Sequence, residues 1–236
     1  WDLLLNKFEG KSGAVDLAIF GSISDFKDPS LDVRGSLTTT IEELKKFLAP
    51  QQADMLTKSE VGGGLILKFV FKGKQKAQDT WQADLIADSP QINIKKLKFA
   101  DFHVETKFKD KFLAFPRVTA NPYDGTLAAN AVIDFSQQNP QYVVQIAARD
   151  IDIGRWKNDT DMKDKNLQGR FSASAELGGF GNNLETMKGK GQFEIKDGHF
   201  WELPVFSGIS NILYIPGMNT IIFGEARGTF TIANKK

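Results

Sequence analysis

Apolar and polar residues alternate along most of this chain with a period of two. In the clearest segment Leu65, Leu67, Phe69 and Phe71 occupy every second position, with Lys68 among the residues between them. Successive side chains of a strand point to opposite faces, so this spacing predicts a strand with one apolar face. The same alternation recurs at 15–20, 31–37, 92–104, 127–135, 142–148, 171–177 and 193–195. The sequence therefore predicts a mainly β protein.

Turn residues between these segments predict antiparallel hairpins. The strand that carries Ile133 and Phe135 is followed by Asn139-Pro140 and then by 142–148, its expected partner. The strand that begins with Phe171 is followed by one that carries Phe193, and a turn is expected at Asp197-Gly198.

A fragment of this region is repeated near the end of the chain. The heptapeptide GQFEIKD at 191–197 is echoed by GTFTIAN at 228–234, 37 positions later. The echo indicates a repeated β unit that breaks off before it is complete. The chain also begins at Trp1 with no signal-like segment. We therefore expect 1–236 to be one continuous β domain cut from a longer protein.

Two short segments have helical spacing. In the first, Ile41, Leu44 and Leu48 have the spacing of one helix face. Thr40 and Glu43 form a capping-box pattern at its start, and Pro50 is expected to follow its end. The second is an apolar helix expected over 204–213.

The expected helices are too small to cover the expected sheet. About ten strands at roughly 4.8 Å spacing span on the order of 48 Å, and each helix is about 10 Å across. The rest of the apolar face must curl on itself, meet a second sheet, or bind something apolar.

Composition narrows the function classes. The chain has 30 Lys and Arg against 29 Asp and Glu, which leaves no net field to attract nucleic acid. It has 19 Phe but only 3 Tyr, a bias toward dry surface over polar recognition. It has no Cys, which excludes disulfides, thiolate metal sites and a cysteine nucleophile, and which fits an exported bacterial protein.

The catalytic inventory is small. His103 and His199 have no partners at triad or metal-ligand spacing, so we expect both to be structural or solvated. Asp150 and Asp152 are expected on the outward face of a strand. The segment 159–164 has three Asp residues but lacks the Gly and Glu of a calcium loop. The sequence therefore predicts no catalytic residue, no metal site and no cofactor.

The order of several phrases resembles the AsmA-like family, which includes TamB- and YhdP-type proteins. A strand with a central glycine leads into a short helix in LDVRGSLTTTIEEL (31–44), and a tyrosine-glycine turn joins two strands in 112–131. IDIGRW (151–156) is similar to the family's exit from strand to helix, and 167–213 is similar to its C-terminal region.

The resemblance implies a long curved antiparallel sheet, taco-like or groove-forming, with two or three short helices. It also implies a periplasmic protein, anchored to the inner membrane by a missing N-terminal segment, that supports the integrity of the outer membrane. Its partners would be phospholipid or another acyl-chain lipid, and envelope proteins. The family has no catalytic signature to transfer to this chain.

The leading hypothesis is therefore a non-enzymatic lipid conduit. The residues expected to line its apolar face are Leu65, Leu67, Phe69, Phe71, Ile133, Phe135, Phe171 and Phe193. Two alternatives remain open: a self-filled β-sandwich that binds a partner protein, and a carbohydrate-active enzyme that uses Asp150 and Asp152.

Overall fold

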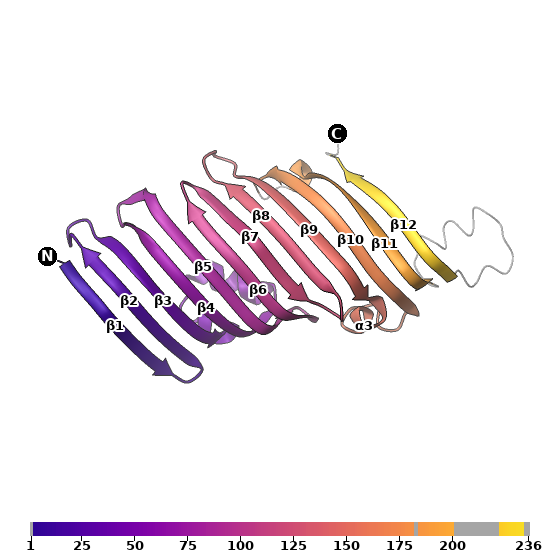
Figure 1. The fold of residues 1–236 in the computed structure, drawn as a ribbon, viewed down its shortest axis with the longest axis horizontal. Helices are drawn as coiled ribbons and strands as arrows, with labels where there is room; N and C mark the ends of the chain where they lie inside the picture. The colour runs from indigo at the N-terminus through magenta and orange to yellow at the C-terminus, as the bar shows by residue number, and fades with distance from the viewer. Residues whose placement is uncertain (1, 182–183, 201–221, 234–236) are drawn as a thin grey trace.

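Twelve strands form one open antiparallel sheet, and consecutive strands are neighbours throughout (Figure 1). The computed structural model describes residues 2–181, 184–200 and 222–233. The strands are β1 (Asp2–Ser12), β2 (Val15–Ser24), β3 (Ser30–Thr40), β4 (Val61–Lys74), β5 (Ala77–Ile94), β6 (Leu97–Lys109), β7 (Phe112–Asn121), β8 (Thr126–Asp134), β9 (Gln141–Asp152), β10 (Leu167–Phe180), β11 (Lys188–Phe200) and β12 (Ile222–Ile232). The predicted fold class, a mainly β protein with a long antiparallel sheet and a few short helices, is confirmed.

Short turns make the meander possible, because antiparallel neighbours need only a few residues to reverse the chain. Between β7 and β8, the N–H of Gly125 donates to the carbonyl of Pro122 at 2.9 Å. Tyr123 and Asp124 both have positive φ, 49° and 61°. Two central residues with positive φ match the turn whose twist suits a hairpin. The predicted hairpin of 127–135 with 142–148 is also confirmed, with Ile133 opposite Tyr142.

Three α-helices, α1 (Ile41–Lys45), α2 (Pro50–Lys58) and α3 (Ile153–Asn158), and one short 3-10 turn, η1 (Leu184–Thr186), accompany the sheet. Helix α1 begins where the capping pattern predicts, since the Thr40 hydroxyl accepts the Glu43 N–H at 3.2 Å. The prediction that this helix extends to Pro50 was wrong. Pro50 instead opens α2, because the first helical position needs no N–H donor.

The second predicted helix, 204–213, lies outside the described residues. Among the helices of the described ranges, none combines the length and the hydropathy that a membrane span requires.

The predicted turn at Asp197-Gly198 was wrong. Strand β11 continues through both residues, and the register with β10 shifts between Gln168 and Arg170. Asp197 has a φ of 50°, so the extra residue is absorbed as a bulge opposite Gly169. An Asp-Gly pair supplies the positive φ that either a turn or a bulge needs, and here the pairing with β12 on the other side keeps the strand extended.

The repeated phrase occupies two adjacent strands, β11 and β12. Gly191 lies opposite Phe230, and Phe193 lies opposite Gly228. Each ring covers the glycine across from it: a Cβ added at Gly191 would lie 2.4 Å from Phe230 Cζ, and one at Gly228 would lie 2.6 Å from Phe193 Cε1. The echo therefore builds a reciprocal pair in which each glycine makes room for the phenylalanine of its neighbour.

We expect Gly191→Ala to lower the free energy of unfolding by about 1–3 kcal/mol, because the new methyl group clashes with the Phe230 ring and with the Ser174 carbonyl, 2.6 Å away. Urea unfolding followed by circular dichroism measures the change. Gly224→Ala, in β12, is the matched control, since a Cβ there meets no atom within 4 Å. Equal stabilities of the two variants would contradict the pairing.

Candidate functional site

One row of apolar residues crosses the entire sheet. Residues directly opposite each other on neighbouring strands share a face, so the register can be followed from edge to edge. From β1 to β12 the row consists of Gly10, Leu17, Leu37, Leu67, Ala87, Val104, Val118, Ala129, Ile146, Ala175, Gly191 and Phe230. Its length is about 50 Å, from eleven steps of about 4.8 Å. We call it the apolar row, and the face that carries it the apolar face.

A second row runs on the same face, four residues away along β4. From β1 to β10 it consists of Leu5, Gly21, Val33, Phe71, Ala83, Phe108, Leu113, Ile133, Tyr142 and Gly179. Tyr142 is its only residue with a polar side-chain atom. The apolar character of the face is therefore not confined to a single line.

The opposite face has a different chemistry. Its corresponding row consists of Lys11, Asp16, Thr38, Ile66, Asp88, His103, Thr119, Ala128, Ala147, Ser174, Gln192 and Thr229. Ion pairs also join strands on this face, for example Lys72 with Asp32 at 2.9 Å and Arg227 with Glu194 at 2.7 Å. The charged residues of the two rows therefore lie on this face, which also exposes some apolar residues such as Ile66 and Val143.

Seven of the eight predicted face residues share the apolar face. Their strands and the cross-strand register bring together Leu65, Leu67, Phe69, Phe71, Ile133, Phe171 and Phe193. Phe135 differs, because β8 ends at Asp134 and the Phe135 N–H donates to the carbonyl of Lys111. It is 43% exposed and belongs to the β8–β9 connection.

The helices pack against one end of this face only. Ile41 of α1 is buried with Leu65, Ala87 and Ile92. Ile153 of α3 is buried with Leu167, and Phe171 packs against the pair. Figure 1 shows α1, α2 and α3 toward the same end of the strands. Residues of β1, β2, β7, β8 and β12 belong to neither buried cluster of the described chain.

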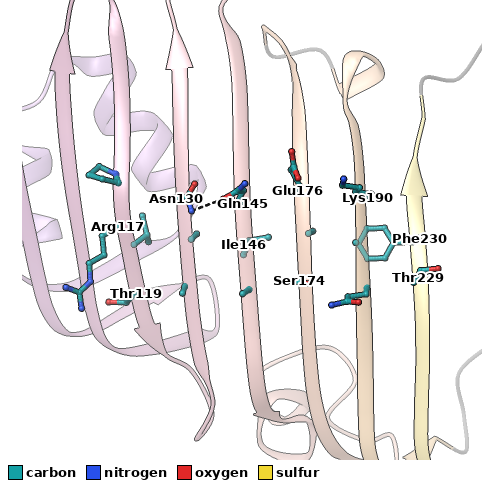
Figure 2. Close-up of a pocket in the computed structure, with 18 of the residues that line it drawn as sticks. Arg117, Thr119, Asn130, Gln145, Ile146, Ser174, Glu176, Lys190, Thr229 and Phe230 are labelled. Carbon is teal, nitrogen blue, oxygen red and sulfur yellow. Dashed lines mark hydrogen bonds between the residues drawn. The ribbon is translucent and has the colours of Figure 1, made fainter.

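A shallow hollow of about 820 Å³ crosses β7–β12 (Figure 2). Most of the side chains that line it belong to the polar face, among them Arg117, Asn130, Gln145, Glu176 and Lys190, and the apolar-row residues of these strands lie between them. On the apolar row itself, small residues occupy much of this stretch, namely Ala129, Ala175 and Gly191. Ile146 and Phe230 remain 36% and 38% exposed. Sequence periodicity identified these strands, but only the register reveals that their small residues align.

His103 lies between two carboxylates on the polar face. Its Nδ1 is 2.7 Å from Asp88 Oδ1, and its Nε2 is 3.3 Å from Glu105 Oε1. The hydrogen bond to Asp88 raises the pKa of His103 above its ordinary value, with a smaller contribution from Glu105, while burial and the Arg117 charge oppose the rise. These contacts join His103 of β6 to Asp88 of β5. His199 lies in β11, and its side chain is outside the described part.

The carboxylates considered for catalysis serve the local structure. Asp152 caps α3, since its Oδ1 accepts the Arg155 N–H at 2.9 Å. Asp150 is exposed and has a φ of 52°, and its N–H donates to the Ser172 hydroxyl at 3.0 Å. The expected continuous strand ends here, because Ile153 begins α3.

Ion pairs join the acidic segment 159–164 to β6 and to the turn that precedes it. Asp159 lies 3.1 Å from Lys98 Nζ, and Asp161 lies 3.3 Å from Lys96 Nζ. In the described ranges, no group of three or more His, Asp or Glu side chains is arranged to hold a metal ion.

No family model, curated protein or solved structure matches this chain. The resemblance to the AsmA-like family therefore rests on the sequence phrases given above.

We expect the pKa of His103 to be above about 6.5, and Asp88→Asn to lower it. Because the folded-state pKa is raised, the stabilisation is full below about pH 6.5 and is lost as the pH rises through the folded-state value. NMR titration of the imidazole protons measures the pKa, with His103→Gln to assign the signal. A pKa that Asp88→Asn leaves unchanged would contradict the hydrogen bond.

Proposed function

We propose that this chain is a non-enzymatic lipid-binding segment, a length of conduit whose apolar face shields acyl chains. The observation that carries the proposal is the apolar row, which crosses all twelve strands without a polar side chain. A ligand that lies along this row runs perpendicular to the strands, from one edge of the sheet toward the other.

The size of the apolar face supports the binding of a ligand that covers it. The two rows are about 13 Å apart along the strands and about 50 Å long, so the band between them has an area on the order of 600 Å². Leu67, Ala87 and Val104 of this band already pack with the buried cluster that contains Ile41 of α1. The part over β7–β12, where Ile146 and Phe230 are exposed, is an apolar patch of the kind that marks binding sites. Burying acyl chain on it contributes roughly 0.8 kcal/mol per methylene. Since this burial is non-directional, the binding free energy is shared among many side chains.

The cellular setting in this proposal comes from the resemblance and from the absence of Cys. The protein acts in the periplasm, attached to the inner membrane through an anchor of the full-length protein. There it supports phospholipid transport to the outer membrane and so the integrity of that membrane.

A second candidate is a module whose apolar face is covered by a partner protein. The described residues form one sheet, so they do not supply the opposing sheet of a self-filled sandwich. The exposed row residues Ile146 and Phe230 favour an external cover of some kind. The two candidate functions are distinguished by whether the purified chain retains lipid or a partner protein.

We expect the gently purified chain to carry phospholipid, detected by native mass spectrometry and by solvent extraction. Ile146→Asp, on the apolar face, is expected to reduce the retained lipid severalfold, because a carboxylate would have to be desolvated beside the acyl chain. Val143→Asp is the matched control. It lies in the same strand on the opposite face and is 44% exposed, against 36% for Ile146.

Because both positions are partly exposed, both variants should fold, and circular dichroism checks this. Two results would contradict the proposal: a wild-type chain that reproducibly carries no lipid, or variants on the two faces that lose lipid equally.

A further inference from the structure

A partly open apolar hollow lies between α3 and the sheet, distinct from the shallow hollow across β7–β12. It has a volume of about 400 Å³. Its lining comes from β9–β11, from α3 and from the turn after α3, and consists of Ile151, Ile153, Trp156, Met162, Leu167, Phe171 and Ile195. Two of these residues, Ile153 of α3 and Leu167 of β10, are buried, at 7% and 2% exposed. We call it the α3 hollow.

The roof of the α3 hollow is held in place by polar contacts on its outer side. Arg155 of α3 forms an ion pair with Asp124 in the β7–β8 turn. Asp159, at the end of α3, accepts a hydrogen bond from the Tyr123 hydroxyl and pairs with Lys98, both at 3.1 Å. Lys157 donates to the carbonyl of Lys165 at 2.6 Å and so closes the following turn. These contacts hold α3 above the sheet, so the space beneath it is preformed.

The lining determines what can occupy this space. All seven side chains are apolar apart from the indole N–H of Trp156. A buried water needs two to four polar partners, and apolar cavities without them stay dry and take up hydrocarbon instead. A headgroup or a charged ligand would be desolvated with no compensating hydrogen bonds. The chemistry therefore selects a hydrocarbon.

The α3 hollow is continuous with the apolar face. Phe171 lies opposite Ile195 in β11, and Ile151 lies opposite Phe171 in β9, so three lining residues are also members of the face. The next position along β10 on this face is Ala173, which lies opposite Phe193. Ala175, two residues further, belongs to the apolar row. A flexible chain lying on the row can turn along β10 and enter the hollow without crossing a polar side chain.

We propose that the α3 hollow receives the methyl end of a fatty acyl chain whose remainder lies on the apolar face. The inference rests on the proposed function, because the chain reaches the hollow from that face. It goes further in giving the ligand a fixed end and a direction: the methyl end lies under α3, and the headgroup lies toward the uncovered part of the sheet. The hollow then acts as an anchoring point within the conduit.

Two tryptophans make the inference testable on the full chain. Trp156 lines the hollow, while Trp81 packs on Phe71 of the uncovered face, with ring centroids 5.9 Å apart. The chain has four tryptophans, so two reporters are made that keep only Trp156 or only Trp81, with phenylalanine at the others. Each is titrated with stearic acid brominated near the carboxyl group or near the methyl end, because bromine quenches a nearby indole.

We expect Trp156 to be quenched severalfold more by bromines near the methyl end than by bromines near the carboxyl group, with release by unlabelled stearic acid. Quenching of Trp81 but not of Trp156 would overturn the α3 assignment and leave the lipid-binding face intact. Quenching of Trp156 alone would keep the hollow and count against the conduit. No quenching of either reporter would overturn both.

A substitution at the edge of the hollow supplies an independent control. Met162 lines it and is 37% exposed, so Met162→Glu should fold while placing a carboxylate against the bound chain. We expect about tenfold weaker half-saturation of the Trp156 quenching, comparable to leaving about two methylenes in water. Met55→Glu on α2, a residue that is 63% exposed, is the matched control and should leave the titration unchanged. Equal titrations of the two variants would overturn the assignment.

Discussion

Cross-strand register is the constraint on which the rest of this structure depends. A slip of one residue turns every side chain of a strand to the other face, so a face that stays apolar over twelve strands requires eleven correct pairings. Bulges endanger this parity, and the sheet contains several. At Asp101 and Asp150 the chain adopts positive φ, and the register shifts beside each of them. On either side of Asp150, Ala148 and Ile151 lie opposite Ala173 and Phe171, which share a face of β10, so this bulge adjusts the strand without exchanging its two faces.

The polar face complements this arrangement. Its ion pairs are exposed, and exposed pairs contribute little to the free energy of folding. Their effect is on solubility and on which side can be covered. Charged residues such as Lys68 and Lys72 lie on the same strand as Phe69 and Phe71 but on the other side. The protein can therefore present a wide apolar surface to one kind of neighbour and remain hydrated toward every other.

The local sequence pattern was enough to predict the strands, because each segment by itself shows the alternation of apolar and polar residues. It was also enough for the start of α1, where Thr40 and Glu43 lie three residues apart. It failed where two outcomes share one local signal. Asp197-Gly198 fits a turn or a bulge, and Pro50 fits the end of one helix or the beginning of the next. Phe135 lies one residue beyond the end of β8, because periodicity does not mark the last residue of a strand.

Contacts between residues that are far apart in the sequence could not be predicted from local patterns. His103 and Asp88 are 15 residues apart and meet only because β5 and β6 are in one particular register. The α3 hollow brings together residues from three strands and a helix, and no local sequence pattern predicts a cavity there. The apolar row itself is invisible in any single strand, since it is a property of the alignment of all of them.

The meander gives the molecule an adjustable length. Each strand touches only its two neighbours, so the sheet behaves as a nearly one-dimensional chain of hairpins whose interactions are between nearest neighbours. Inserting one hairpin between two others would preserve chain direction and the identity of both faces, and would extend the sheet by about 10 Å. Insertion of a two-strand hairpin is therefore a simple route by which such a protein acquires its span.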